Sequence, residues 1–175
     1  VKVMSLDLFL AGRPLPMGGK GARQIVKELL ALTDWGILDF LIVDTPPSTG
    51  DVLMTLIKII GNRSGSIVVT TPSALSTSIV RRVIKILLAA QIPIFGVLEN
   101  MSYIASSKAR PLTHSRRKSL ASEFGIKFLG ELPIDYKAVE AADASDIPSL
   151  LQTDFAKALL TSMKNSNLFT IKTKN

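Results

Sequence analysis

The chain of 175 residues is 47% hydrophobic and 6% aromatic, which suffices for one buried core of single-domain size. Because it contains no cysteine, thiolate metal sites, thiol redox chemistry and cysteine nucleophiles are excluded within these residues. The net charge of +7 suits a polyanionic partner, such as nucleic acid or an acidic membrane surface. A net charge of this size is also common in proteins that it merely keeps soluble. No apolar run approaches the roughly 18 residues of a transmembrane segment and no secretory signal opens the chain, so we expect a cytoplasmic protein.

Continuous apolar runs mark the expected strands. The chain opens with residues 2–6, which are typical of a strand already in progress. Later runs cover residues 40–43, 67–69, 94–98 and 128–129. Continuous runs, in contrast to alternating ones, predict strands that are buried on both faces of a parallel sheet.

Segments with helical spacing lie between these runs. They cover residues 22–32, 52–60 with Gly61 as the stop, 75–88, and 149–163 with Leu151 among its apolar positions. Strand alternating with helix predicts an α/β fold with a doubly wound, mostly parallel sheet and helices on both faces. We expect residues 1–163 to belong to a single domain, and the basic residues 164–175 to form a loose tail or a short edge element.

An aspartate, Asp44, follows the expected strand at residues 40–43. Ligands of such sheets bind beyond the carboxyl ends of the strands, where a carboxylate can hold a magnesium ion or its water beside phosphates. Two prolines then fix the backbone direction, and residues 48–51 supply a turn and an N-cap for the next helix. The alternative is that Asp44 only forms a turn or caps a helix.

Two motifs lie on this pattern of strands and helices. Residues 44–51 are Asp-Thr-Pro-Pro-Ser-Thr-Gly-Asp, and residues 97–103 are Val-Leu-Glu-Asn-Met-Ser-Tyr. Both resemble signatures of the Mrp/ApbC family, MinD-related P-loop ATPases that carry iron–sulfur clusters, although that family usually has Gly at the place of Ser48. Shorter matches lie at residues 34–36, 69–72 and 128–135. The resemblance covers nearly the whole chain and implies the C-terminal part of a nucleotide-binding α/β domain of the P-loop NTPase type.

The resemblance implies roles for the first motif. Asp44 would be the acidic residue that holds magnesium through water. Thr45 and Asp51 would belong to the switch that senses the γ-phosphate of ATP during hydrolysis.

The resemblance also implies roles near the later strands. Asn100 would contact the adenine edge, and Pro133 and Asp135 would belong to the loop that packs against the base. The structural alternatives are that Asn100 caps a turn, that Pro133 merely ends a strand, and that Asp135 caps the helix at Tyr136.

The family's phosphate-binding loop, with its strand and helix, is missing from this sequence. The run Gly18-Gly19-Lys20-Gly21 follows prolines, not an apolar strand, and no Ser or Thr follows its lysine. We therefore expect a flexible loop there and not a phosphate cradle. For this chain alone we expect little or no ATPase activity.

The family's cluster-binding Cys-x-x-Cys pair is also missing. Ser106 and Ala109 stand where the thiolates would be, and neither ligates iron usefully, so no iron–sulfur cluster is expected in this chain. The surrounding residues 108–118 are basic, with Lys108, Arg110, Arg116, Arg117 and Lys118 beside the lone His114. This segment is either a solvated basic loop or a contact for nucleic acid or an acidic surface.

The resemblance implies an ATP- and magnesium-binding protein that in its intact form is a slow ATPase acting in iron–sulfur cluster carriage or assembly. Its partners would be a second copy in a homodimer and iron–sulfur client proteins. One alternative is a MinD/ParA-like positioning protein whose nucleotide state controls attachment to membrane or DNA, which the basic charge favours. The other is a degenerate scaffold that no longer binds nucleotide.

Overall fold

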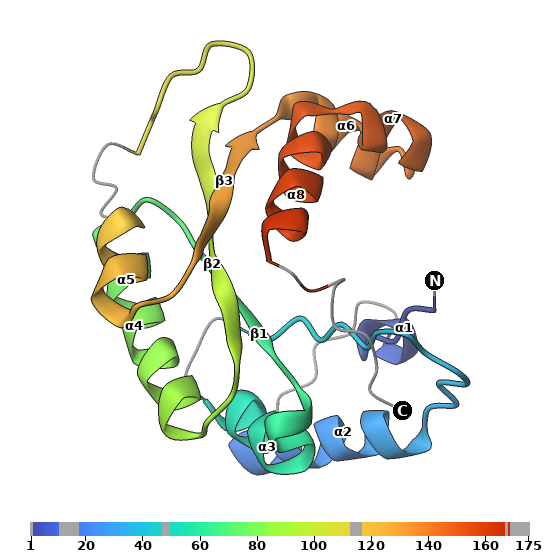
Figure 1. Ribbon diagram of the computed structural model, residues 1–175. Helices are drawn as coiled ribbons and strands as arrows, with labels where there is room; N and C mark the ends of the chain where they lie inside the picture. The colour runs from blue at the N-terminus through green and yellow to red at the C-terminus, as the bar shows by residue number, and fades with distance from the viewer. Residues whose placement is uncertain (1, 11–17, 47–49, 113–116, 167, 169–175) are drawn as a thin grey trace. The chain divides into compact units, whose positions relative to one another are not determined.

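The computed structural model describes the chain except residues 1, 11–17, 47–49, 113–116, 167 and 169–175 (Figure 1). The chain divides into two compact units, Val1–Arg63 and Ser64–Asn175, which we call the N-terminal and the C-terminal unit. Each is considered by itself.

The N-terminal unit is helical in its described part. It contains α1 (Asp7–Leu10), α2 (Gly19–Leu32), α3 (Asp51–Ile60) and the 3-10 turn η1 (Gly61–Arg63). The helices predicted at residues 22–32 and 52–60 are thereby confirmed, each beginning slightly earlier than expected. The flexible loop predicted at residues 18–21 is wrong from Gly19 on, because this glycine is the first residue of α2. Gly61 ends α3 with φ 56° and a backbone N–H that donates to the carbonyl of Ile57, because glycine adopts left-handed φ without steric cost.

The strands predicted at residues 2–6 and 40–43 are wrong for the part of the chain that is described. Residues 2–5 and 40–46 have no regular secondary structure, and the side chain of Ile42 is 88% exposed. A strand exists only where a neighbouring strand completes its hydrogen-bond ladder. The described sheet consists of three strands of the C-terminal unit, so an apolar sequence alone does not make residues 40–43 a strand.

The C-terminal unit is built on a parallel sheet in the order β1-β2-β3. Its strands are β1 (Ser66–Thr70), β2 (Ile94–Ile104) and β3 (Phe128–Ile134), which confirms the strands predicted at residues 67–69, 94–98 and 128–129. Between them run α4 (Ala74–Ala89) and α5 (Arg117–Phe124), and α6 (Tyr136–Asp143), α7 (Ile147–Gln152) and α8 (Asp154–Asn165) follow β3. Helices α4 and α5 lie on one side of the sheet and α8 on the other (Figure 1), as the α/β prediction requires.

The core of this unit lies on both sides of the central strand. Val97 and Leu98 of β2 are buried, as are Ile84 of α4 and Leu129 of β3. On the α8 side the buried side chains pack against Phe155, Leu159 and Met163. Gly130 of β3 allows this close packing, because a Cβ atom there would overlap the hydroxyl of Ser162.

The single helix predicted at residues 149–163 is wrong, because the chain breaks at Thr153 into α7 and α8. The Thr153 hydroxyl donates to the carbonyl of Leu150 at 2.7 Å and accepts from the amide of Ala156 at 3.2 Å. One side chain therefore ends α7 and caps α8. Leu151, placed by the prediction on the apolar face, is 57% exposed. The predicted domain boundary after residue 163 remains a prediction.

Among the described residues, no helix has both the length and the apolar character of a transmembrane segment.

Candidate functional site

The first motif begins in irregular backbone of the N-terminal unit. Asp44 and Thr45 are exposed and belong to no helix or strand. The sequence predicts Asp44 at the carboxyl end of a buried strand. Because residues 40–43 form no strand, the setting of Asp44 differs from this prediction. Residues 47–49 lie outside the described residues. The magnesium and switch roles of Asp44 and Thr45 remain predictions.

Asp51, the last residue of this motif, is the first residue of α3, and its N-cap is Gly50. The carboxylate accepts a hydrogen bond from Arg23 Nη1 of α2, with 2.7 Å between Nη1 and Oδ1. Its backbone carbonyl accepts from the Thr55 hydroxyl at 2.6 Å. The Arg23 and Asp51 side chains are 43% and 44% exposed, so solvent screens this ion pair and its contribution to stability is small.

The Asp51 carboxylate also abuts the beginning of α2. A Cβ atom on Gly19, the first residue of α2, would overlap the carboxylate oxygen Oδ2. Helix α2 has neither an acidic residue in its first turn nor a side-chain cap. Because a negative charge is favourable at a helix N-terminus, Asp51 supplies this charge to α2 as well as to α3.

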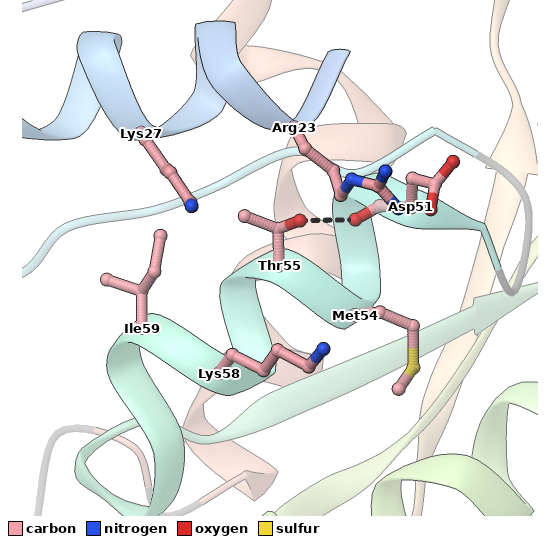
Figure 2. A pocket seen from close by; sticks show the side chains of 7 residues that line it. All are labelled: Arg23, Lys27, Asp51, Met54, Thr55, Lys58 and Ile59. Atoms are coloured by element: carbon pink, nitrogen blue, oxygen red, sulfur yellow. Dashed lines mark hydrogen bonds and ion pairs between the residues drawn. The ribbon is translucent and has the colours of Figure 1, made fainter. Parts of the chain in front are cut away.

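A pocket of about 610 Å³ adjoins this ion pair. It is lined by Arg23, Lys27, Asp51, Met54, Thr55, Lys58 and Ile59. Figure 2 shows Lys27 extending from α2 toward α3, with Lys58 on α3 itself. Three basic side chains against one carboxylate make the lining cationic. Sequence analysis missed Arg23, Lys27 and Lys58; the only sequence signal was the spacing of Arg23 and Lys27, which places both on one face of a helix.

Asn100 lies in β2 of the C-terminal unit and is half-buried. Its side-chain oxygen Oδ1 accepts a hydrogen bond from the amide of Met101 at 2.9 Å. Met101 is half-exposed and has φ 57°, a left-handed conformation that few non-glycine residues adopt. Asn100 thus stabilises its own local turn, as the structural alternative expected, and the adenine role remains a prediction.

Two buried polar residues flank this turn, and sequence analysis missed both. Glu99 and Ser102 are each 1% exposed. The Ser102 hydroxyl donates to Glu99 Oε1 at 2.8 Å and to the Glu99 carbonyl at 3.1 Å. Both residues belong to the motif at residues 97–103, but the hydrogen bond between them depends on the local backbone conformation of β2.

Pro133 and Asp135 lie at the carboxyl end of β3. Pro133 is fully buried and Asp135 is 8% exposed. The Asp135 oxygens Oδ1 and Oδ2 accept from the backbone amides of Lys137 and Phe155, each at 3.1 Å. Asp135 therefore caps α6, as the structural alternative expected, and also bonds the first turn of α8. A role for either residue in base binding remains a prediction.

A second pocket, of about 370 Å³, lies at the same end of this unit. It is lined by Ala105, Ser106, Ile134, Asp135, Tyr136, Lys137, Gln152, Thr153, Asp154 and Lys157. The loop after β2, the loop after β3 and the beginning of α8 therefore converge there, beyond the carboxyl ends of two strands, where ligands of parallel sheets bind.

The turn after β2 is tight. The Ile104 amide donates to the Ala109 carbonyl and the Lys108 amide to the Ile104 carbonyl, both at 2.8 Å. Ser106 and Ala109 lie in this turn, and a hydroxyl and a methyl group do not fit an iron–sulfur cluster, which thiolates bind. Among the described residues, no group of three or more His, Asp or Glu side chains could hold a metal ion.

Two cations of the basic loop, Lys108 and Arg110, are paired with carboxylates. Lys108 Nζ lies 3.8 Å from Asp154, and Arg110 donates to Glu131 at 2.9 Å. Both cations also lie over the ring of Tyr103, at 5.3 Å and 5.8 Å from its centroid. His114 and Arg116 lie outside the described residues, as do the side chains of Arg117 and Lys118. The acidic partners come from distant parts of the chain and leave less free positive charge than the sequence indicates.

Comparison with known proteins shows the family of this chain. The model of the ParA family described as NUBPL iron-transfer P-loop NTPase matches residues 1–166. The iron–sulfur cluster carrier protein of Saccharolobus solfataricus is 33% identical over 152 residues, 83% of this chain and 51% of its own length. The iron–sulfur cluster transfer protein NUBPL of Dictyostelium discoideum is 32% identical over 164 residues, 90% of this chain and 50% of its own. The chain thus spans about half the length of these relatives.

Solved structures share the fold. A nucleotide-binding protein of Archaeoglobus fulgidus in complex with ADP aligns with TM-score 0.62 and 28% identity over 86% of this chain and 58% of its own. The MinD protein of Pyrococcus horikoshii, complexed with Mg-ADP, aligns with TM-score 0.60 and 18% identity over 87% of this chain and 58% of its own. This second likeness concerns the fold alone. With the family match over residues 1–166 and the identity to curated relatives, the chain belongs to the NUBPL iron-transfer family of P-loop NTPases.

Proposed function

We propose that the intact protein binds ATP with magnesium, hydrolyses it slowly, and acts as a cytoplasmic homodimer in iron–sulfur cluster carriage or assembly for client proteins. Two findings support this proposal: curated relatives are named iron–sulfur cluster carrier proteins, and a related structure contains ADP. Because the turn with Ser106 and Ala109 offers no thiolate, the cargo cluster would be held by other ligands.

The observation that carries the nucleotide proposal is the setting of Asn100. Its amide lies on a left-handed turn in the last part of β2, toward the sheet edge where ligands of α/β proteins bind. A side-chain amide complements the N6 and N7 atoms of adenine, because it donates to N7 and accepts from N6. One bond to Met101 leaves Oδ1 a second lone pair for this contact.

Asp44 is the residue we propose for magnesium. An exposed carboxylate is an oxygen ligand of the kind that this ion prefers, either directly or through water. Magnesium bound there would neutralise charge on the nucleotide phosphates.

Base recognition is tested in the full-length protein by measuring ATP and GTP affinity of the wild type and of Asn100→Ala. Loss of a paired amide within a site costs about 1–3 kcal/mol, so ATP affinity should fall and GTP affinity should change little. Equal loss for both nucleotides would make Asn100 a structural residue only.

A nucleotide-controlled attachment to nucleic acid or acidic membrane is the second candidate, and the net charge of +7 favours it. Because Lys108 and Arg110 are paired with carboxylates, we assign any such contact to Arg116, Arg117 and Lys118. Binding to DNA or acidic vesicles should then weaken steeply with salt, and replacing these residues by alanine should reduce the salt slope. A slope that the triple substitution leaves unchanged would exclude this contact.

A further inference from the structure

A bulge interrupts the pairing of β2 with β3. Glu99 pairs with Glu131, and Tyr103 pairs with Pro133, so that the three residues 100–102 stand opposite the single residue Leu132. Bulges are frequent next to functional sites, where they redirect a side chain out of the regular alternation of a strand. Here Asn100 is the first residue of the bulge.

The tip of this bulge has an unfavourable backbone conformation. Met101 has φ 57°, a left-handed conformation that costs free energy for a residue with a Cβ atom and persists only where surrounding contacts enforce it. The hydrogen bond from the Met101 amide to Asn100 Oδ1 is one such contact. It also fixes the plane of the Asn100 amide.

A buried hydrogen bond joins the two ends of the bulge. Ser102, the last bulged residue, donates to both the carboxylate and the carbonyl of Glu99, the residue before the bulge. Both side chains are 1% exposed. A buried carboxylate is costly unless it is hydrogen-bonded, and an apolar residue would fill this position of β2 at lower cost. The presence of Glu99 therefore calls for a reason beyond packing.

We propose that Glu99 and Ser102 are positioning residues, which hold Asn100 in the orientation that recognises the adenine base. The contact between them keeps residues 99 and 102 together, so that Asn100 and Met101 project from the strand as one rigid turn. Neither residue touches the nucleotide. The inference rests on the proposed function, because it assigns the base to Asn100.

The energetic test uses Ser102→Ala in the full-length protein, with ATP and GTP affinities measured by calorimetry. ATP affinity should fall about tenfold, as expected for the loss of one hydrogen bond, while GTP affinity stays constant. In the Asn100→Ala background the same change should alter ATP affinity by less than about twofold, because Ser102 acts through Asn100. Losses that multiply in the double variant, or equal losses for ATP and GTP, would overturn the proposal.

Two variants separate positioning from general damage. Ser162→Ala removes a hydroxyl that is 2% exposed in α8 and lies against Gly130 of β3, not against residues 99–102, and should leave the preference for ATP unchanged. Glu99→Gln keeps an oxygen that can accept from Ser102 and should retain most of the wild-type ATP affinity. Loss of preference in Ser162→Ala would show that any buried hydroxyl matters equally and would overturn the assignment.

A nucleotide-free measurement distinguishes failure of the inference from failure of the proposed function. In Ser102→Ala the amide of Met101 should exchange its hydrogen about tenfold faster, because the turn opens more often, and it should be unchanged in Ser162→Ala. An unchanged rate in Ser102→Ala would overturn the positioning of Asn100. A wild-type protein without preference for ATP over GTP would instead overturn base recognition by Asn100, whatever the exchange rate.

Discussion

Replacing Asp135 by alanine tests whether this residue holds the C-terminal helices together. Its two oxygens accept one backbone N–H each, from α6 and from α8, at 3.1 Å. Loss of an N-cap costs about 0.5–2 kcal/mol, and a second amide left without its partner near the core costs about 1–3 kcal/mol. Since Asp135 is only 8% exposed, water replaces these bonds poorly. We expect Asp135→Ala to lower the free energy of unfolding by about 2–4 kcal/mol.

Urea unfolding of the chain, followed by circular dichroism, measures this loss, and amide exchange at Lys137 and Phe155 assigns it. Asp146→Ala is the matched control, because Asp146 is exposed and caps α7 by accepting a hydrogen bond from the amide of Ser149 at 3.1 Å. Asp146→Ala should lower the free energy of unfolding clearly less than Asp135→Ala does. A free energy of unfolding within about 0.5 kcal/mol of wild type in Asp135→Ala would refute the capping account. Weakened ATP binding at unchanged stability would favour contact with the base.

Further predictions concern the helix contacts and the turn after β2. Gly19→Ala should change the stability of the N-terminal unit little, because the added methyl overlaps only the carboxylate of Asp51, a side chain that is 44% exposed and can turn aside. Fluorescence of Trp35, which lies in this unit, follows its unfolding, and a clearly lowered midpoint would show that this carboxylate cannot move. Thr153→Ala should lower the free energy of unfolding by about 1–2 kcal/mol, because the hydroxyl bonds to α7 and α8 are lost. Urea unfolding measures this change, and an unchanged free energy would show that the chain breaks between α7 and α8 without the Thr153 cap. After anaerobic reconstitution with iron and sulfide the chain should remain colourless, because residues 105–109 offer no thiolate; a stable visible cluster with stoichiometric iron would contradict this.

The three strands of the sheet were predictable because their sequence pattern and their environment agree. Continuous apolar runs at residues 94–98 and 128–129 lie between helices on the two sides of the sheet, an environment that such runs need. The run at residues 67–69 pairs with the central strand β2, although Val69 on this edge strand is 52% exposed. Residues 40–43 have the same pattern but no regular secondary structure. Pairing is a tertiary property, and the composition of one segment does not reveal it.

The sequence predicted the identities of the candidate site residues better than the contacts that these residues make. The resemblance singled out Asn100 and Asp51. The bulge that contains Asn100 and the ion pair of Asp51 with Arg23 join residues whose spacing in the sequence does not predict a contact. For Asp135, the sequence offered a cap and a base contact as alternatives. The cap is visible in the structure, because backbone amides from two helices meet at one carboxylate.

The most direct test of the central claim is the rate of magnesium-dependent ATP hydrolysis by the full-length protein and its Asp44→Ala variant. We expect slow hydrolysis in the wild type, and loss of it in Asp44→Ala with the fold intact, because the variant lacks the carboxylate proposed to hold magnesium. Asp39→Ala, which removes an exposed carboxylate shortly before the motif, should keep the wild-type rate. Hydrolysis at the wild-type rate in Asp44→Ala, with magnesium present, would contradict the account.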